Sequence, residues 1–406
     1  MSGRENWFSW EPRPKGVEKT SSCPFRKVYV VMNERKCRAC DSDDLLESPQ
    51  FLGLSLVNSD CRPSPINQPI YQCTRCGLVQ KVVTKQVASA LNLIYQSYRA
   101  YEHGLEPLVF GGDSLGTRAD AICDEIEAAI DLPISGQLLD VGCSDGAFLK
   151  AFKAKQPNWR LAGFDLNPES RLGIEAICGP ERFFQDRIDD ISERFDLIVF
   201  NYVLEHVDKI NELLTAAVAR LRPHGKVAIV VPDLNRNPFD LIIADHLSHF
   251  DLASIKVQLQ MFESVECREF LDKELLILVS RFSVGREISI SPGLRSARSL
   301  GDLVEKLLFA RDQAIELAIK HRGNFAIFGT ATAGTWLSQE LKDIDHLFVD
   351  EDFRKYGRKY SKRDVVHPSE ISKDGLIFLP MPQHVANRIM ARLSRVTAAK
   401  LVVAST

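Results

Sequence analysis

The sequence predicts a doubly wound α/β sheet, preceded by a cysteine-rich segment and followed by a second, smaller α/β unit. Short apolar runs alternate with stretches of helical periodicity between residues 91 and 285, as in parallel sheets covered by helices. Two Cys-x-x-Cys pairs precede this region, and a shorter strand and helix alternation follows it. We therefore expect three segments, residues 1–90, 91–285 and 286–406.

The composition does not favour a nucleic-acid-binding, membrane-spanning or secreted protein. The chain has 406 residues and a formal net charge of -3, which does not favour a nucleic acid polymer as partner. No apolar run approaches the ~20 residues that a membrane span needs, and the N-terminal stretch lacks the apolar region of a secretory signal. We expect a cytoplasmic monomer or homodimer whose clustered cysteines bind metal or serve catalysis instead of forming disulfides.

Four apolar segments are expected to be buried parallel strands. They are GQLLDV (136–141), WRLAGFDL (159–166), FDLIVFNYVL (195–204) and GKVAIVVPD (225–233). Residues 262–282 place two apolar runs around a charged turn, which predicts an antiparallel hairpin at the sheet edge. Beyond residue 299 the pattern predicts a long amphipathic helix, then a strand, a glycine-bounded turn and a helix.

The paired cysteines predict a structural zinc site. Cys37 and Cys40 form the first pair, and Cys73 and Cys76 form the second. Four thiolates at this spacing suit the tetrahedral coordination of Zn²⁺. Such a site leaves no open coordination position, so we expect the metal to support the fold and not the chemistry. Cys61 lies between the pairs and is a possible substitute ligand.

A glycine-rich turn predicts a cofactor site. Gly142 and Gly146 follow the first apolar strand and precede a helix. Glycine lets the backbone turn sharply and approach a ligand, and an open parallel sheet binds cofactors at such strand ends. Asp165 ends the next strand, where its carboxylate could accept hydrogen bonds from both ribose hydroxyls of a nucleoside. Asp186 follows a third strand and could reach an adenine amino group; either aspartate could instead be a solvated loop residue.

In this region the chain resembles class I S-adenosylmethionine-dependent methyltransferases. The resemblance rests on LLDVGCSDG, GFDLNPES, FDLIVFNYVLEHV and LRPHGKVAIVVPD, which follow one another in the family's order. It implies a Rossmann-like core that binds S-adenosyl-L-methionine. His206, in the LEHV motif, is expected to be local structure and not a catalytic group. The implied cofactor-binding residues are Asp140, Gly142, Cys143, Gly146, Asp165, Leu166, Asp186, Asn201 and Tyr202.

The arrangement of the whole chain is similar to that of zinc-containing sugar C-methyltransferases of deoxysugar pathways, whose relatives serve surface-polysaccharide synthesis. The similarity includes the cysteine pairs, YQSYRAYEHG before the core, and the C-terminal IFGTATAGTWL and FVDEDFRKYGRKYSKRDVVHPSEI. It implies methylation of the carbon beside the keto group of a nucleotide-linked sugar.

The stretch ADHLSHFDLAS supplies the expected base. The family has a Glu-His-x-x-Tyr-Phe type motif here, which Asp245, His246 and His249 match in place of its Glu, His and Tyr; another family tyrosine is replaced by Ile243. The resemblance implies that His246 removes the proton, with His249 supporting the acceptor or replacing the tyrosine hydroxyl. Asp245 or another carboxylate could orient one ring nitrogen. Alternatively, both histidines pack against or cap the next helix. We do not expect a metal-hydrolase site, because His246 and His249 lack a third clustered ligand in the sequence.

The C-terminal unit is expected to hold the acceptor. Gly329, Thr330 and Gly334 lie at a predicted helix start, where backbone N–H groups favour a phosphate. Asp350, at the next strand end, could meet a sugar or ribose hydroxyl. A purely structural turn is the alternative.

Three functions remain open from the sequence. The leading one is transfer of a methyl group to carbon in a nucleotide-linked sugar, a small-molecule acceptor. The second is a saccharide O-methyltransferase in surface-polysaccharide synthesis. The third is a non-enzymatic scaffold derived from a methyltransferase, which the intact Asp140, Gly142, Gly146 and Asp165 oppose.

Overall fold

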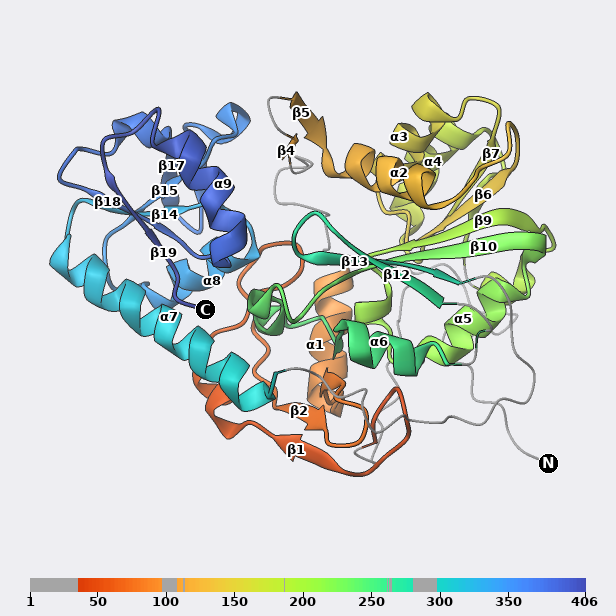
Figure 1. Cartoon of the computed structure of the whole chain (residues 1–406), viewed down its shortest axis with the longest axis horizontal. Helices are drawn as coiled ribbons and strands as arrows, with labels where there is room; N and C mark the ends of the chain where they lie inside the picture. Colours follow the sequence, from red (N-terminus) through yellow and green to blue (C-terminus); the bar gives the residue numbers. More distant parts are fainter. Residues whose placement is uncertain are drawn as a thin grey trace, which may run out of the picture.

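The computed structural model describes residues 36–96, 108–111, 114–185, 187–260, 262, 265–279 and 298–406. Asp186 and the N-terminal lead-in therefore lie outside the described residues. Figure 1 shows a central sheet in yellow and green, a blue C-terminal unit beside it, and the red and orange N-terminal strands below both. No helix in the described part of the chain is both long and apolar enough to cross a membrane.

The central sheet has seven strands in the order β12-β13-β10-β9-β6-β7-β8. Five of them are parallel, while β13 runs antiparallel to β10 and pairs with β12 as the expected hairpin. The chain moves outward from β6 to β8 and then returns to β9 on the other side of β6, which creates a crevice at the carboxyl edge. The strands are β6 (Gln137–Val141), β7 (Arg160–Phe164), β8 (Phe183–Phe184), β9 (Phe195–Asn201), β10 (Leu221–Pro232), β12 (Val265–Phe270) and β13 (Glu274–Val279).

Helices of ordinary amphipathic pattern accompany this sheet. The first, α2, begins at a capping box in which Thr117 and Asp120 satisfy each other's backbone N–H groups. The second, α3, begins directly after Gly146 and buries Phe148 and Phe152. The helices are α2 (Arg118–Ala129), α3 (Ala147–Lys155), α4 (Arg171–Cys178), α5 (Ile210–Val218) and α6 (Leu252–Gln258).

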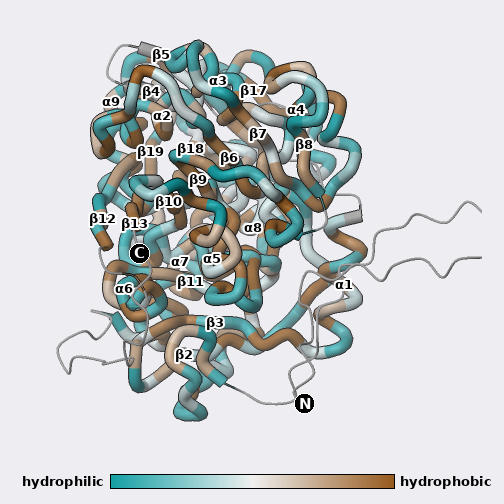
Figure 2. Tube along the Cα trace, turned by 90° about the vertical axis from the view of Figure 1, so that its right-hand side faces the viewer, coloured by the Kyte–Doolittle hydropathy of each residue, from teal (hydrophilic) through white to brown (hydrophobic). Residues whose placement is uncertain are grey.

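The N-terminal sheet has four strands, and one of them comes from far along the chain. Its order is β1-β2-β3-β11, with β1 (Leu45–Glu47), β2 (Ile70–Cys73), β3 (Val79–Lys81) and β11 (Ser248–His249). The last two pair antiparallel, with Ser248 opposite Gln80 and His249 opposite Val79; Figure 2 shows β11 just above β3. The division near residue 90 stays a prediction, but strand pairing crosses it. Helix α1 (Lys85–Gln96) and a hairpin of β4 (Leu108–Gly111) and β5 (Ser114–Thr117) connect the two sheets.

The C-terminal unit contains a six-stranded sheet in the order β16-β17-β15-β14-β18-β19. All pairs are parallel except β16 with β17. The expected long helix and the strand–turn–helix are both present, as α7 and as β14 followed by α8. The elements are α7 (Leu300–Lys320), β14 (Phe325–Phe328), α8 (Thr332–Glu340), β15 (Leu347–Val349), β16 (Lys359–Tyr360), β17 (Arg363–Val366), β18 (Leu376–Leu379), α9 (Gln383–Leu393) and β19 (Lys400–Val403).

One hydrophobic cluster joins the N-terminal and C-terminal parts around a short turn of the middle segment, η6 (Pro238–Ile242). Phe239 of this turn meets Trp336 of α8 edge to face, with ring centroids 5.9 Å apart. The backbone N–H of Ser55 donates to Glu340 Oε1 at 2.6 Å, which ties the first segment to the same helix. The turn is therefore enclosed by chain from both ends of the sequence.

Two glycine substitutions test the packing of α8. A Cβ added to the buried Gly334 would lie 2.0 Å from the carbonyl oxygen of Gly329, so Gly334→Ala should cost ~1–3 kcal/mol of unfolding free energy, as overpacking does. Gly301 in α7 is the control, because its Cβ would meet only Ser299 Oγ at 3.7 Å. Gly301→Ala should instead stabilise by up to ~1 kcal/mol through helix propensity. Urea denaturation measures both; equal unfolding free energies in the two variants would contradict the packing.

Candidate active site at the carboxyl edge of the central sheet

The turn between β6 and α3 requires glycine at two positions. Gly142 and Gly146 have φ angles of +78° and +82°, a region that favours glycine. A Cβ on Gly142 would lie 2.6 Å from Val203 Cγ2, and one on Gly146 would lie 2.8 Å from Ile174 Cδ1. The bare backbone of this turn thus packs against neighbouring side chains, and the backbone N–H groups of Gly142 and Cys143 donate to the carbonyl of Phe164 at the end of β7.

Two of the predicted cofactor carboxylates lie at this turn. Asp140 is buried, and its Oδ1 has no hydrogen-bond partner. Burial, together with the charges of Asp165 and Asp145, raises the pKa of Asp140 to about 8. Asp165 accepts hydrogen bonds from the backbone N–H groups of Ser144 and Asn167, each at 2.8 Å. A buried carboxyl oxygen without a partner is costly, so Asp140 could hold a donor group of a bound cofactor.

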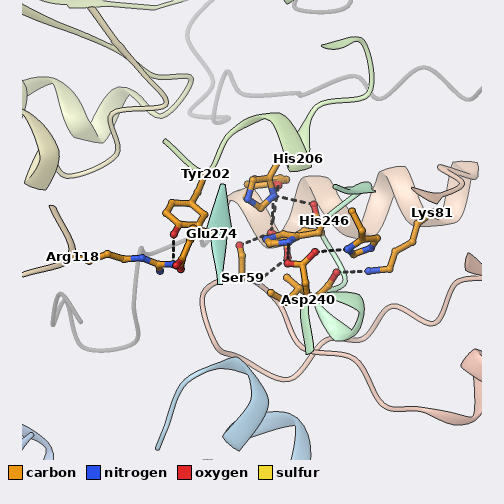
Figure 3. Close-up of polar contacts among 12 residues, drawn as sticks. Ser59, Lys81, Arg118, Tyr202, His206, Asp240, His246 and Glu274 are labelled. Atoms are coloured by element: carbon orange, nitrogen blue, oxygen red, sulfur yellow. Dashed lines mark hydrogen bonds and ion pairs between the residues drawn. The ribbon is translucent and has the colours of Figure 1, made fainter. Parts of the chain in front are cut away.

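The end of β9 carries an aromatic side chain that stacks with a cation. Tyr202 has a φ of +55°, which is rare for a residue with a side chain. The Arg118 guanidinium lies 4.1 Å from the centroid of its ring and donates to its hydroxyl and to Glu274 (Figure 3). Asn201, just before it, has a buried Oδ1 without a hydrogen-bond partner. Sequence reasoning missed Arg118, because only the fold brings the start of α2 to this edge.

Residues 240–249, called the histidine loop below, lead from η6 through β11 toward α6. Helix α6 is capped by Asp251, whose Oδ1 accepts from the backbone N–H of Ser254 at 2.7 Å. The two histidines of the loop are therefore not the N-cap of this helix. Both are buried, as is Asp240 at the start of the loop.

One carboxylate holds both imidazoles. His246 Nδ1 lies 2.8 Å from Asp240 Oδ1 (Figure 3). His249 Nδ1 lies 2.6 Å from Asp240 Oδ2. A carboxylate can only accept hydrogen bonds, so each Nδ1 carries its proton. In a neutral ring the lone pair is then on Nε2, the nitrogen opposite Asp240. The carboxylate that orients His246 is thus Asp240, and not the adjacent Asp245.

The charges around Asp240 give the two histidines different pKa values. Burial acts to lower the pKa of His246, but the Asp240 carboxylate and its hydrogen bond outweigh burial and hold that pKa above its usual value. Burial and the charge of Lys81 lower the pKa of His249 to about 3, so this ring is neutral. Burial lowers the pKa of Lys81 to about 7, and its ammonium group donates to the carbonyl of Ile243. Of the two rings, His246 is the one that readily gains a proton.

Asp245 is bound by a different set of groups. Its Oδ1 accepts from the backbone N–H of Ser59 at 2.7 Å, and its Oδ2 accepts from Ser59 Oγ at 2.6 Å. Its carbonyl oxygen lies 2.9 Å from His206 Nδ1, and the Tyr95 hydroxyl lies 3.0 Å from the same nitrogen. Ser59 was not predicted, because no local pattern marks a residue that contacts a loop so distant in sequence. Tyr95 opens the stretch YQSYRAYEHG, which is part of the family resemblance, but the sequence assigned it no role.

His206 lies against His246, with ring centroids 4.7 Å apart and the planes at 89°. Beside them Glu205 is buried, both of its carboxylate oxygens lack a hydrogen-bond partner, and burial raises its pKa to about 7. Donor atoms of Glu205, His206 and His246 lie within 4.8 Å of one another, as do those of Asp240, His246 and His249. The expectation that the two histidines lack a third clustered donor was therefore wrong.

The four paired cysteines meet at one point. Cys37 Sγ lies 3.4 Å from Cys76 Sγ, and Cys40 Sγ lies 3.6 Å from Cys73 Sγ; all four sulfurs lie within 4.8 Å of one another. Tetrahedral zinc with bonds of ~2.3 Å separates its sulfur ligands by ~3.8 Å. The thiols therefore fit such an ion, and Cys61 is not part of this group.

The residues predicted to hold the acceptor lie together in the C-terminal unit. Gly329 has a φ of +83°, and its backbone N–H donates to Val349 O at 2.7 Å. Thr330 Oγ1 lies 3.5 Å from Asp350 Oδ2, which also accepts from Lys355 Nζ at 2.7 Å. These contacts account for the local structure, and Gly334 serves the close packing of α8 on the turn.

Comparisons with known proteins bear on the central sheet. Residues 115–263 match the family described as a methyltransferase domain. The C-methyltransferase NovU of Streptomyces niveus is 27% identical over 256 residues, covering 56% of this chain and 55% of NovU. The mitochondrial ubiquinone biosynthesis O-methyltransferase of Saccharomyces cerevisiae is 23% identical over 217 residues, covering 52% and 67%. Ribosomal RNA small subunit methyltransferase C of Haemophilus influenzae (strain PittEE) is 23% identical over 261 residues, covering 58% and 72%.

Among solved structures, the Burkholderia thailandensis 1,6-didemethyltoxoflavin-N1-methyltransferase, with its substrate and S-adenosylhomocysteine bound, is 20% identical to this chain. The similarity has a TM-score of 0.33 and covers 41% of this chain and 79% of that one.

The chain spans about half the length of NovU. The family match, the glycine turn and the switch between β6 and β9 coincide in one region. Residues 115–263 of the chain thus form a class I S-adenosylmethionine-dependent methyltransferase domain.

Proposed function

We propose that the protein transfers a methyl group from S-adenosylmethionine to a nucleotide-linked sugar, at the carbon beside a keto group, with His246 as the base. The observation that carries this proposal is the buried contact of 2.8 Å between His246 Nδ1 and Asp240. It orients the ring and leaves Nε2 to take a proton. NovU, which the chain resembles at 27% identity, is named a C-methyltransferase. The net charge of -3 favours a small acceptor over a nucleic acid polymer.

The residues that would bind the cofactor lie around the glycine turn between β6 and α3. Bound S-adenosylmethionine would supply an electrophilic methyl group on a sulfonium centre. Asp140 would accept from the methionine ammonium group, and Asp165 would accept from the ribose hydroxyls. Asn201 and Tyr202, at the end of β9, would lie near the sulfonium. Cys143 and Leu166 complete the set proposed within the described residues; Asp186, proposed for the adenine, lies outside them.

In the acceptor half, neutral His246 would take the proton from the sugar carbon onto Nε2, and the electron pair of the broken C–H bond would move to the keto oxygen. As the carbonyl reforms, the carbon would bond to the methyl group, the bond from that methyl group to the sulfonium sulfur would break, and S-adenosylhomocysteine would leave with the electron pair. The imidazolium proton would pass to solvent. Asp240 favours the imidazolium, because its carboxylate stabilises the positive ring. The hydroxyl of Tyr95, near His206, is the proposed donor to the developing enolate oxygen, where such donors are most effective.

A saccharide O-methyltransferase is the second candidate function. His246 could equally remove the proton of a sugar hydroxyl, a reaction that needs no enolate donor. One observation favours it: Ile243 stands where C-methyltransferases of the resembled family have a tyrosine. In the structure its hydrogen bonds to the site are made by its backbone, with Lys81, Asp240 and His246, and its side chain offers no hydroxyl. His249 is held between Asp240 and β3, so it is less suited than Tyr95 to replace a phenol.

Two further roles belong to the same proposal. The C-terminal turn with Gly329, Thr330, Gly334 and Asp350 would hold the nucleotide part of the acceptor; α8, which begins at this turn, packs on the η6 turn that carries Asp240. The four cysteines would bind one structural zinc ion, which their sulfur separations support. The histidine loop would then be the meeting point of both units.

An acceptor panel tests the function. The protein would be incubated with ¹³C-methyl-labelled S-adenosylmethionine and nucleotide-linked sugars with and without a keto group, and NMR would locate the methyl group. We expect a carbon-bound methyl on keto sugars only. His246→Ala should lose about 10²–10⁴ in turnover, the usual worth of a positioned base, while affinity for S-adenosylhomocysteine is kept.

His224→Ala is the matched control, because His224 is exposed on β10, and it should turn over normally. An oxygen-bound methyl would support the O-methyltransferase instead. A protein that binds no S-adenosylhomocysteine would be the scaffold, and a His246→Ala variant within a few-fold of the parent would exclude His246 as the base.

Calorimetry tests the cofactor contacts. Asp165→Ala should weaken binding of S-adenosylhomocysteine by ~1.5–3 kcal/mol, the scale of hydrogen bonds to a charged group. Asp131→Ala is the control, because this exposed residue precedes β6 at the opposite edge of the sheet. Unchanged affinity in Asp165→Ala would count against the assignment.

Elemental analysis tests the zinc site. We expect about one zinc per chain, since four thiolates complete the coordination of one ion. Cys73→Ser should lose zinc and unfold the N-terminal sheet more easily, because metal binding contributes to folding free energy. Cys61→Ser should retain the ion. Purified protein without metal, whose four thiols react freely, would refute the site.

The pH dependence tests the role of Asp240. A base works when it is neutral, so turnover should rise with pH through the pKa of His246. Asp240 holds that pKa above its usual value, so Asp240→Asn should move the acid limb of the turnover profile to lower pH and reduce its maximum. An acid limb that stays in place or moves to higher pH would be inconsistent with charge stabilisation by Asp240.

A further inference from the structure

Arg38 links the cysteine cluster to the loops that carry the histidines. It lies in the turn between Cys37 and Cys40, and its side chain is only 7% exposed. Its Nε donates to Asp208 Oδ1 at 2.7 Å, and its Nη1 donates to the carbonyl of Leu247 at 3.0 Å. A guanidinium group can serve two acceptors in fixed directions at once.

Both acceptors belong to segments that carry an imidazole. Leu247 follows His246 directly, and Asp208 lies two residues after His206. The backbone N–H of Leu247 also donates to the carbonyl of Glu205 at 2.6 Å, which joins the two segments. One buried arginine therefore fixes the two segments whose rings meet edge to face.

Strand pairing holds the same loop from a second direction. Strand β3 begins three residues after Cys76 and pairs with β11, which contains His249. The backbone N–H of Lys81 donates to Leu247 O at 2.9 Å, so this carbonyl accepts from both β3 and Arg38. The backbone N–H of Arg38 in turn donates to Gln80 Oε1 at 2.9 Å.

The second cysteine turn provides a natural comparison. Arg75 lies between Cys73 and Cys76, as Arg38 lies between Cys37 and Cys40, but its side chain is exposed. Asp208, the partner of Arg38, has a side chain only 11% exposed. A hydrogen-bonded ion pair this far from solvent holds its geometry tightly, and removing one partner leaves the other charge uncompensated.

We propose that Arg38 is a positioning residue that transmits the geometry of the cysteine cluster to His206 and His246. The inference rests on the proposed function, in which His246 is the base. Thiolate coordination would fix the turn at residues 37–40, and Arg38 would fix the histidine loop to that turn. The glycine turn and Asp165 receive none of the described contacts of Arg38. The acceptor half of the site therefore depends on the cysteine cluster, while the cofactor half does not.

The test compares Arg38→Ala, Arg38→Lys and Arg75→Ala in the full chain. For Arg38→Ala we expect kcat to fall by about tenfold to hundredfold, the range that a misplacement of 1 Å can cause. Zinc content and affinity for S-adenosylhomocysteine should stay within about twofold of the parent, in keeping with a loss of positioning alone. Arg38→Lys should keep the positive charge but not both hydrogen bonds, so its kcat should lie between that of the parent and that of Arg38→Ala. Added guanidinium ion should restore part of the kcat of Arg38→Ala, and Arg75→Ala should match the parent.

A second measurement separates this inference from the proposed function. NMR titration of the histidine ring protons needs no acceptor; Arg38→Ala should shift the signals and pKa of His206 and His246, and Arg75→Ala should not. If these shifts appear but no sugar is methylated, the coupling stands and the function fails. Unchanged histidine titration and unchanged kcat in Arg38→Ala would overturn the inference. So would a parallel loss of zinc or of cofactor affinity, which would mean a general folding role.

Discussion

The carboxylate of Asp240 is the constraint around which the histidine loop, the proposed acceptor half of the site, is organised. It is only 1% exposed, so its charge must be met by buried donors, and the two imidazoles supply them. Segments from distant parts of the sequence surround this carboxylate. Strand β3 pairs with β11 of the histidine loop, and α8 packs on the η6 turn that carries Asp240. The N-terminal and C-terminal parts meet around η6 through a shared hydrophobic cluster, and Asp240 of this turn is buried.

The parts of the fold with local signals could be predicted from the sequence. The strands of the central sheet, its edge hairpin and the glycine turn each follow from periodicity or backbone requirements within a few residues. The partners of the histidine loop could not be predicted, because Asp240 lies in PFDLI, which reads as an apolar turn. Ser59, Tyr95 and Arg38 reach the site through long-range packing. Tyr95 and Arg38 lie in stretches that the sequence does mark, YQSYRAYEHG and the first cysteine pair, but neither stretch indicates contact with the histidine loop.

The two proposed halves of the site therefore differ in how their geometry is determined. The cofactor half is built from consecutive strand ends, where the parallel sheet itself determines the geometry. The acceptor half is assembled from segments that are distant in sequence. Buried groups without a hydrogen-bond partner occur in both halves: Asp140 Oδ1 and Asn201 Oδ1 in the cofactor half, and both oxygens of Glu205 and Nε2 of His249 in the acceptor half. Such groups lower stability, and their gathering in one place is typical of a site kept for binding or chemistry.

The pairing of β11 with β3 bears on how such a protein can change over evolutionary time. The segment that matches the methyltransferase family, residues 115–263, includes the histidine loop but neither Lys81 nor Ser59, which line it. A recombination breakpoint near residue 90 would transfer the methyltransferase domain of residues 115–263 but separate β11 from its partner strand β3. Exchanging segments between relatives is therefore a poor route to a new acceptor in this architecture. Acceptor preference should instead drift through compensating substitutions in sequence-distant stretches that are inherited together.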